Sequence, residues 1–272
     1  MSRVTRLGAA LFALAAVLAV AVSLLAGPPA DLSQKLQAPS AGHPLGTDAL
    51  GRDLLWRIAG GAGNSLVIGG AATALALFCA MVLGGSAGWM GGIWDGLVSR
   101  LTEIVLCFPL LVLVLLCVVA EPPALAALPD PARVALFVGL LGWPGMARLF
   151  RGEVLRIRES DLARSAVSAG AGPARLLLSH LVPSAAGILG PALALFFSHT
   201  ILVESSLSFL GFGVRPPATS LGGLLRDAVS GGPHDWWLAV FPGAAIALLL
   251  LAANLAEDDL RRARAAGALS GR

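Results

Sequence analysis

Few polar groups in this 272-residue chain could do chemistry, and their spacing does not favour catalysis. Ser198 and His199 are sequence neighbours that point apart on a helix, so they do not pair as nucleophile and base, and no G-x-S-x-G motif is present. Lys35 is the one lysine, and no G-x-x-x-x-G-K-[ST] phosphate-binding loop occurs. We therefore expect no enzymatic activity, and any ATP that drives this protein must be held by a partner.

The histidines and cysteines do not predict a metal site or a disulfide framework. The histidines lack ligand spacing, and the topology given below puts His180 on the opposite side from the others. The cysteines lie in apolar runs, and an odd number of them there is typical of small packing residues. We therefore expect no cofactor and no structural metal. These residues are His43, His180, His199 and His234, and Cys79, Cys107 and Cys117.

Glu204 and His199 are the ionisable residues near the C-terminal end of one long apolar segment. Ionisable residues at membrane depth are usually functional or paired. The two lie about 140° apart around a helix of about 3.6 residues per turn, so they do not share a face. Two interpretations of Glu204 stay open: it holds the following loop by hydrogen bonds, or it lines a pathway or gate with Ser205 and Ser208. We interpret His199 as a packing residue.

The elements that must position these groups are transmembrane helices. The chain is 57% hydrophobic and 13% charged, with a mean hydropathy of +0.82, which excludes an ordinary soluble domain and indicates an all-α polytopic membrane protein. Six apolar segments fit the hydrocarbon core, although 104–120 is at the lower limit of length. They are residues 7–26, 65–85, 104–120, 134–147, 181–203 and 236–256.

Two of these segments have alternative interpretations. Residues 7–26 are followed by Gly27-Pro28-Pro29-Ala30, as a signal peptide would be, but the apolar run is long for that, so we predict an uncleaved anchor. Residues 134–147 are short and contain Pro144, which would suit a re-entrant helix. A helix that continues past Arg148, together with the charge distribution, favours a full span.

The distribution of basic residues predicts the orientation. Six spans place both termini and the loop before His180 on one side, and 13 of the 19 basic residues fall on that side. The positive-inside rule makes this side cytoplasmic. The 13 residues are Arg3, Arg6, Arg100, Arg148, Arg151, Arg156, Arg158, Arg164, Arg175, Arg261, Arg262, Arg264 and Arg272.

Two local patterns predict further structure. In HPLGTDALGRDLLWRI, Thr47 or Asp48 can cap a short amphipathic helix at the membrane surface, whose apolar side would carry residues such as Leu54 and Ile58. In the uncharged run 58–94, Gly84, Gly88 and Gly92 are spaced by four, which permits close helix packing in lipid. Gly91-Gly92 is equally suited to a turn.

The stretch 160–184 has the sequence SDLARSAVSAGAGPARLLLSHLVPS. It separates two apolar segments, and it is not itself expected to span the membrane. Small residues fall on helical spacing up to Gly170, and Gly-Ala-Gly-Pro then interrupts the pattern. A second helical pattern around Leu177 is closed by Pro183. Glycine suits the end of one helix and proline the first turn of the next. We predict a helix-turn-helix whose small residues let a partner protein approach closely.

Three separated motifs resemble the dipeptide/oligopeptide/nickel permeases of bacterial ABC importers. They are HPLGTDALGRD, the helix-turn-helix with Gly170, and ESSLSFLGFGVRPP from Glu204 to Pro217, in the order of that family. The resemblance covers roughly His43 to the C-terminus and implies a type I importer permease fold. It implies a second permease subunit, two ATP-binding subunits and an extracytoplasmic solute-binding protein as partners in the bacterial inner membrane.

The resemblance also implies a role for the helix-turn-helix, which would dock on the ATPase. The family carries a Glu-Ala-Ala triplet there, and Arg164 stands at the glutamate position, with Ser165-Ala166 at the alanines. Three alternatives stay open: the partner ATPase has changed as well, this contact is dispensable, or nearby Asp161 substitutes as the carboxylate. The residues expected to couple the permease to the ATPase are Asp161, Ala163, Arg164, Ser165, Ala166, Gly170, Leu177 and Pro183.

On this interpretation the chain divides into a cytoplasmic N-terminus (1–6), a first anchor (7–26), an extracytoplasmic loop with a short amphipathic helix (27–60), a permease domain (61–256) with the coupling loop at 149–183, and a cytoplasmic tail (257–272). Its function would be ATP-driven import of di- or oligopeptides, with nickel or a nickel chelate as the alternative cargo. A secondary transporter is disfavoured because it would need charges near mid-membrane. A non-transporting assembly subunit is the remaining alternative.

Overall fold

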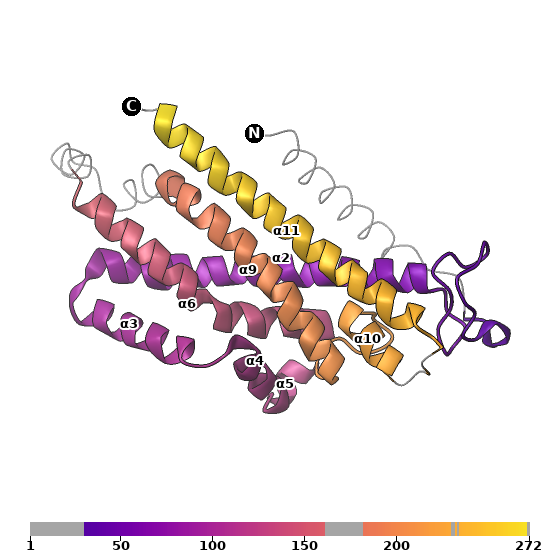
Figure 1. Cartoon of the computed structure of the whole chain (residues 1–272). Coiled ribbons are helices and arrows are strands. Elements are labelled where there is room, and N and C mark those ends of the chain that lie inside the picture. The colour runs from indigo at the N-terminus through magenta and orange to yellow at the C-terminus, as the bar shows by residue number, and fades with distance from the viewer. Residues whose placement is uncertain (1–29, 161–181, 230–231, 233, 271–272) are drawn as a thin grey trace.

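The computed structural model describes residues 30–160, 182–229, 232 and 234–270, with the side chains of residues 126, 182–188 and 256–270 left aside. In this part of the chain the regular structure is helical, apart from an isolated β-bridge between Thr47 and Asp53. Figure 1 shows the arrangement. The helices are η1 Leu32–Gln34, α2 Leu54–Met90, α3 Gly92–Leu106, α4 Leu110–Val119, α5 Pro123–Ala126, α6 Asp130–Arg158, α9 Val182–Leu210, α10 Leu221–Val229 and α11 Trp237–Ser270.

Helix α2 packs against α3, α6, α9, α10 and α11, and it runs along most of the molecule (Figure 1). Its first free N–H groups are capped by Asp53, whose carboxylate accepts a hydrogen bond from Leu55 N at 2.9 Å. The separate short amphipathic helix predicted within residues 27–60 is therefore not present. Leu54 and Ile58 belong to the first turns of α2, because the cap lies directly before them.

The contact between α2 and α6 depends on small residues. A Cβ atom on Gly84 would lie 2.4 Å from Ala147 O, and one on Gly88 would lie 2.8 Å from Val154 Cβ. The predicted close packing is thus confirmed for these two glycines. Gly91 and Gly92 instead have φ values of 67° and 59° and form the turn between α2 and α3. Both interpretations of the glycine series are correct, at different positions.

The predicted span 104–120 is not one straight helix. Helices α3 and α4 meet at an angle of 88° across a break at Cys107–Pro109. Pro109 has no N–H to continue the helical ladder, and it disfavours the helical conformation of Phe108. A count of apolar residues alone does not register this break.

Helix α6 settles the ambiguous segment 134–147. The helix has 29 residues, contains Pro144 and continues past Arg148 to Arg158, so the expected continuation is confirmed. Four helices are long and apolar enough to cross a membrane, or five if α3 and α4 form one bent span. The remaining predicted span, residues 7–26, lies outside the described residues.

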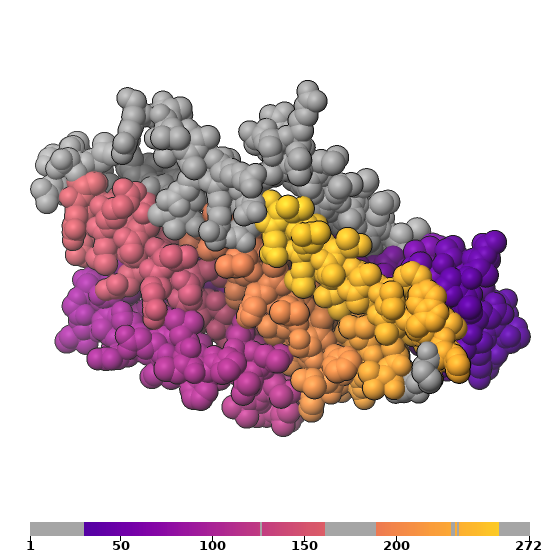
Figure 2. All heavy atoms as spheres, viewed as in Figure 1, coloured from indigo at the N-terminus to yellow at the C-terminus, as the bar shows by residue number. Residues whose placement is uncertain are grey.

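Of the four apolar clusters that hold the described helices together, two contain the most buried residues. One joins α2, α4, α6 and α9 around Ile68, Val138 and Leu207. The other lies at one end of the molecule, where Leu221 of α10 and Trp237 of α11 pack against the start of α2. Figure 2 shows residues 30–53, in indigo, against the yellow C-terminal helices at this same end. The loop and three helix ends therefore form one packed unit.

Candidate functional site

Glu204 is fully buried, with 0% of its surface exposed, and it faces serine hydroxyl groups. Ser65 Oγ of α2 donates to Glu204 Oε2 at 2.8 Å, and Ser208 Oγ donates to Glu204 Oε1 at 2.9 Å. Ser205 Oγ lies 3.4 Å from Oε2. Ser208 can reach because residues four apart share a helix face. The carboxylate thus ties α9 to α2 inside the membrane-spanning bundle.

The same cluster holds the chain that follows α9. Ser208 Oγ accepts a hydrogen bond from Val214 N at 3.1 Å. Asn64 of α2 donates from Nδ2 to Thr219 O at 2.8 Å. A Cβ atom on Gly222 would lie 1.9 Å from Ser205 O, so α10 begins in direct contact with the backbone of α9. Hydrogen bonds from α2 and α9 therefore fix the loop between Leu210 and Leu221.

The structure brings together the three residues predicted at a pathway or gate, Glu204, Ser205 and Ser208. All three are buried, and this geometry favours the loop-holding interpretation over direct exposure to a solute. Their partner Ser65 was missed from the sequence. Its signal was a buried hydroxyl within an otherwise apolar run, where a polar side chain needs a hydrogen-bond partner.

The histidines among the described residues lie apart from this cluster, and His180 lies outside those residues. His199 is exposed on α9, so the interpretation of it as a packing residue is wrong for this chain, although it does lie on a different face from the buried Glu204. The ring nitrogens of His43 lie 2.8 Å from Asp53 Oδ2 and 2.6 Å from Gln34 Oε1. Within the described ranges, no three His, Cys, Asp or Glu side chains could surround a metal ion.

The motif HPLGTDALGRD forms a compact cap over the end of the bundle. Gly46 and Gly51 have φ values of 79° and 70°, which favour glycine. A Cβ atom on Gly51 would lie 1.8 Å from Asp31 O, and one on Gly46 would lie 2.9 Å from the Trp237 ring. Trp237 Nε1 also donates to Thr47 O at 3.2 Å. Gly46 thus permits the loop to lie directly on α11, and Gly51 permits the loop to close on its own first residues.

Asp48 is the polar centre of this cap. Its carboxylate accepts hydrogen bonds from Leu50 N at 2.8 Å, from Arg52 N at 2.9 Å, and from Arg52 Nε and Arg57 Nη1 at 2.7 Å. Burial by itself would raise the pKa of Asp48, but the hydrogen bonds from Arg52 and Leu50 and the charge of Arg57 outweigh it, so the pKa lies below its usual value. The ionised form therefore stabilises the cap.

Acid is expected to loosen this cap only below about pH 4. Because the pKa of Asp48 is lowered by folding, its stabilising contribution is present above the unfolded value of about 3.9 and is lost as the pH falls through the folded value. Hydrogen exchange of residues 36–53, corrected for intrinsic rates, should be constant from about pH 7 to about pH 4 and should rise below that. Asp48→Asn should exchange faster already at about pH 7. Faster exchange of the unaltered chain near pH 6 would contradict this assignment.

A pocket of about 380 Å³ opens at the same end of the molecule, and two distant sequence motifs meet there. Asp48 of the motif HPLGTDALGRD and Arg57 of α2 line the pocket. Pro216 of the motif ESSLSFLGFGVRPP lines it as well. Asp227 of α10 completes the polar wall and lies 3.4 Å from Arg57 Nη1. The pocket is therefore lined by residues of both motifs.

The opposite end of the bundle leads into the predicted coupling loop. Arg158 donates from Nη1 to Gly88 O at 3.1 Å and to Trp89 O at 3.0 Å, which satisfies carbonyl groups at the C-terminus of α2. Arg151 forms a bidentate ion pair with Asp95 of α3. These contacts, which were not predicted, fix the helix that enters the loop.

Most of the predicted coupling residues lie outside the described residues. Pro183 lies in the first turn of α9, among the residues whose side chains are not described. The others lie outside the described residues, and they are Asp161, Ala163, Arg164, Ser165, Ala166, Gly170 and Leu177.

Comparison with known proteins identifies the family. The family described as "Binding-protein-dependent transport system inner membrane component" matches residues 80–263. The chain belongs to this family. It is therefore a permease subunit of a binding-protein-dependent importer, and a protein of the membrane. Members of this family are transport permeases rather than catalytic subunits.

Individual relatives cover almost the whole chain. The permease is 34% identical over 269 residues to the oligopeptide transport system permease protein OppC of Mycobacterium tuberculosis, covering 96% of this chain and 91% of that protein. It is 35% identical over 237 residues to the dipeptide transport system permease protein DppC of Bacillus subtilis, covering 86% and 71%. These matches confirm the resemblance stated from the three motifs.

A solved structure supports the fold. A chain of the MetNI methionine ABC transporter, in an inward-facing conformation, superposes with a TM-score of 0.58 at 20% identity, covering 78% of this permease and 97% of that chain. At this identity the likeness concerns the fold alone. The helical bundle described here is that of an ABC importer permease.

Proposed function

We propose that this permease forms one half of the translocation pathway of an ATP-driven importer of di- or oligopeptides. The strongest support is the 34% identity to an oligopeptide transport permease over nearly the full length of both chains. The partners would be a second permease, two ATP-binding subunits and an extracytoplasmic solute-binding protein. The pocket beside Asp48 and Pro216 is the surface on which the binding protein would dock.

The proposed topology has six spans with both termini in the cytoplasm of a bacterial cell, in its inner membrane. Residues 7–26 would supply the span that precedes the four or five candidate helices. The clustering of Arg148, Arg151, Arg156 and Arg158 at the end of α6 supports a cytoplasmic position for the coupling loop, because basic residues are enriched on that side.

The proposed mechanism is rigid-body coupling. Closure of two ATP-bound ATPase subunits would move the cleft that holds residues 161–181, and α6 and α9 would carry that displacement into the membrane. Helix α6 is suited to this because Gly84 and Gly88 of α2 contact it directly, so the two helices move as one body. The binding-protein side would respond through α9, whose Glu204 cluster fixes the outer loop.

Gly170→Leu is expected to abolish transport without affecting insertion into the membrane. A bulky side chain at the turn of the helix-turn-helix would keep the ATPase from approaching the backbone, while the spans are untouched. The test is uptake of a labelled dipeptide by the reconstituted importer, together with copurification of the ATPase. Gly145→Leu is the matched control, because a Cβ atom on Gly145 of α6 meets no atom within 4 Å.

Two results would overturn the proposal. Full transport by Gly170→Leu would remove the docking role of that turn, and labelling of residues 160–184 from the extracytoplasmic side would remove the topology. The cargo is tested by competition in the same uptake assay. Unlabelled dipeptides should compete, whereas competition by nickel salts alone would favour the metal cargo.

A further inference from the structure

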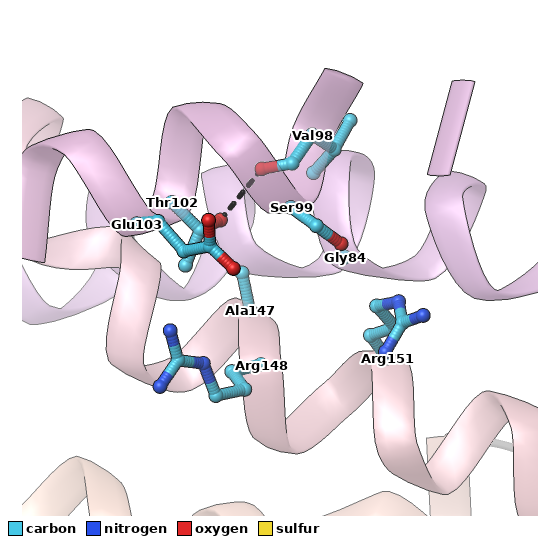
Figure 3. Close-up of a pocket in the computed structure, with 8 residues that line it drawn as sticks. All are labelled: Gly84, Val98, Ser99, Thr102, Glu103, Ala147, Arg148 and Arg151. Atoms are coloured by element: carbon cyan, nitrogen blue, oxygen red, sulfur yellow. Dashed lines mark hydrogen bonds between the residues drawn. The ribbon is translucent and has the colours of Figure 1, made fainter. Parts of the chain in front are cut away.

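A cavity of about 300 Å³ lies between α3 and α6, at the end of the bundle opposite the residue 30–53 cap. Figure 3 shows it with Ser99, Thr102 and Glu103 on the α3 side and Arg148 and Arg151 on the α6 side. The cavity exists because α2 and α6 meet here through Gly84 and Ala147, which have no side chains long enough to fill it.

The side chains around this cavity carry one positive charge that no carboxylate balances. Asp95 is neutralised by its bidentate ion pair with Arg151, and Glu103 Oε2 accepts a hydrogen bond from Arg100 Nη1 at 3.0 Å. Arg148 is exposed and forms no hydrogen bond or ion pair with any described residue. A ligand with a single negative charge would therefore balance the site.

The donors available also suit a phosphodiester. Arg151 uses Nε and Nη2 on Asp95, so its Nη1 group is left to donate. Arg148 lies three residues before Arg151, and residues at this spacing share a helix face. Figure 3 shows the two guanidinium groups extending in opposite directions, so a phosphate at Arg148 would be held by that one guanidinium, whose fork of N–H groups matches two phosphate oxygens. The Thr102 hydroxyl is not a donor to the cavity, because it donates to Val98 O at 2.8 Å.

The depth of the cavity is that of lipid headgroups. Asp130 marks one polar boundary of α6, where it binds Arg215 Nη2 at 3.0 Å and Arg215 is 60% exposed. At a rise of about 1.5 Å per residue, Arg148 lies about 27 Å further along the helix. The hydrocarbon core of a bilayer is about 30 Å thick, so Arg148 lies close to the opposite interface.

The surface beside the cavity is suited to acyl chains. Leu97, Leu101 and Ile104 of α3 are 59%, 46% and 60% exposed, and they share the helix with the residues that line the cavity. A phosphate held by Arg148 would thus lie across the cavity from a helix with exposed apolar side chains. Cationic pockets between transmembrane helices with such apolar flanks are typical headgroup sites.

We propose that this cavity binds the phosphodiester headgroup of an anionic phospholipid, with its acyl chains along α3. The lipid would bridge α3 and α6, and α6 continues towards the predicted coupling loop. The site requires only that α6 spans a membrane, and it is independent of the cargo. Failure of the lipid experiment below would leave the transport assay of Gly170→Leu unaffected, so the two failures can be told apart.

The test measures lipid binding to the full chain, purified with its partners, in nanodiscs of phosphatidylcholine with increasing phosphatidylglycerol. Native mass spectrometry should show retained phosphatidylglycerol on the unaltered chain. Arg148→Gln should weaken the preference for phosphatidylglycerol about fivefold to tenfold, as expected for the loss of one interfacial arginine. Arg148→Lys, which keeps the charge, should retain most of it.

Lys35→Gln is the matched control, because it removes one exposed charge at the other end of the molecule and should leave the preference unchanged. Equal phosphatidylglycerol retention by Arg148→Gln and the unaltered chain would overturn the site. Displacement of the lipid by millimolar inorganic phosphate or glycerol phosphate would overturn the lipid as its source, since a soluble anion would then suffice.

Discussion

Glu204→Ala is expected to destabilise the permease by about 3 kcal/mol and to release the loop after α9. The substitution leaves the hydroxyl groups of Ser65 and Ser208 without their acceptor in a buried site, and it opens a cavity where the carboxylate was. Thermal unfolding of the detergent-solubilised chain should show the loss. Hydrogen exchange at residues 211–220 should rise, because Val214 N bonds to Ser208 Oγ.

Two serine variants on α9 test whether the Glu204 cluster contributes more to stability than an ordinary serine on the same helix. Ser208→Ala removes a hydroxyl that bridges Glu204 and Val214, whereas Ser206→Ala removes an exposed one that only donates to Leu202 O at 2.8 Å. We expect measurable destabilisation from the first and almost none from the second. Equal effects would show that the cluster contributes nothing specific.

Glu204→Gln distinguishes the two interpretations of this carboxylate. The amide keeps the side-chain volume and one acceptor oxygen. If Glu204 holds the loop, the variant protein should therefore lose stability and transport in proportion. A residue that contacts the solute would lose transport while the unfolding temperature stays unchanged. The buried geometry predicts the first result.

Gly84→Leu is expected to prevent α2 and α6 from packing and to remove most of the folded protein. Even the first side-chain atom would come within 2.4 Å of Ala147 O and 2.9 Å of Ala147 Cα, and a backbone cannot move aside as a flexible side chain can. Overpacking of a close contact costs about 1–3 kcal/mol, and a branched side chain against a backbone belongs at the upper end or beyond. Yield of monodisperse protein and its unfolding temperature measure the effect.

Gly70→Leu is the control on the same helix. Gly70 is exposed, and a Cβ atom there meets no atom within 4 Å, so the substitution should leave yield and unfolding temperature nearly unchanged. Replacing glycine within a helix removes a conformational penalty of up to about 1 kcal/mol, which would favour the folded chain slightly. Comparable losses from both variants would mean that the α2–α6 contact is not the cause.

Much of the helical architecture could be predicted because a membrane imposes a simple rule. Backbone groups in lipid must bond within the segment, so long apolar runs become helices, and α2, α6, α9 and α11 lie where such runs occur. The ends of these helices could not be predicted from hydropathy, because polar caps such as Asp53 set them. The break before α4 was missed because Pro109 acts through a missing N–H and not through polarity.

The residues of the candidate sites were likewise predicted only in part from the sequence. The sequence pointed to Glu204, Ser205 and Ser208, since polar groups in an apolar segment require partners. It could not supply Ser65, because that partner comes from another helix, 139 residues away in sequence. Likewise, Asp48 was interpreted as a helix cap, whereas in the fold it is the hydrogen-bond acceptor of Arg52 and Arg57.

By itself the amino-acid sequence determined that the protein is a helical membrane protein, which family it resembles, and how unevenly arginine is distributed along the chain. These properties follow from composition and from short motifs, which are local. Tertiary structure alone decided that the motifs around Asp48 and Pro216 share one pocket, that Glu204 is bound to α2, and that Arg148 is left with its charge unbalanced. Such pairings depend on how helices far apart in the chain are packed, and no local pattern contains that packing.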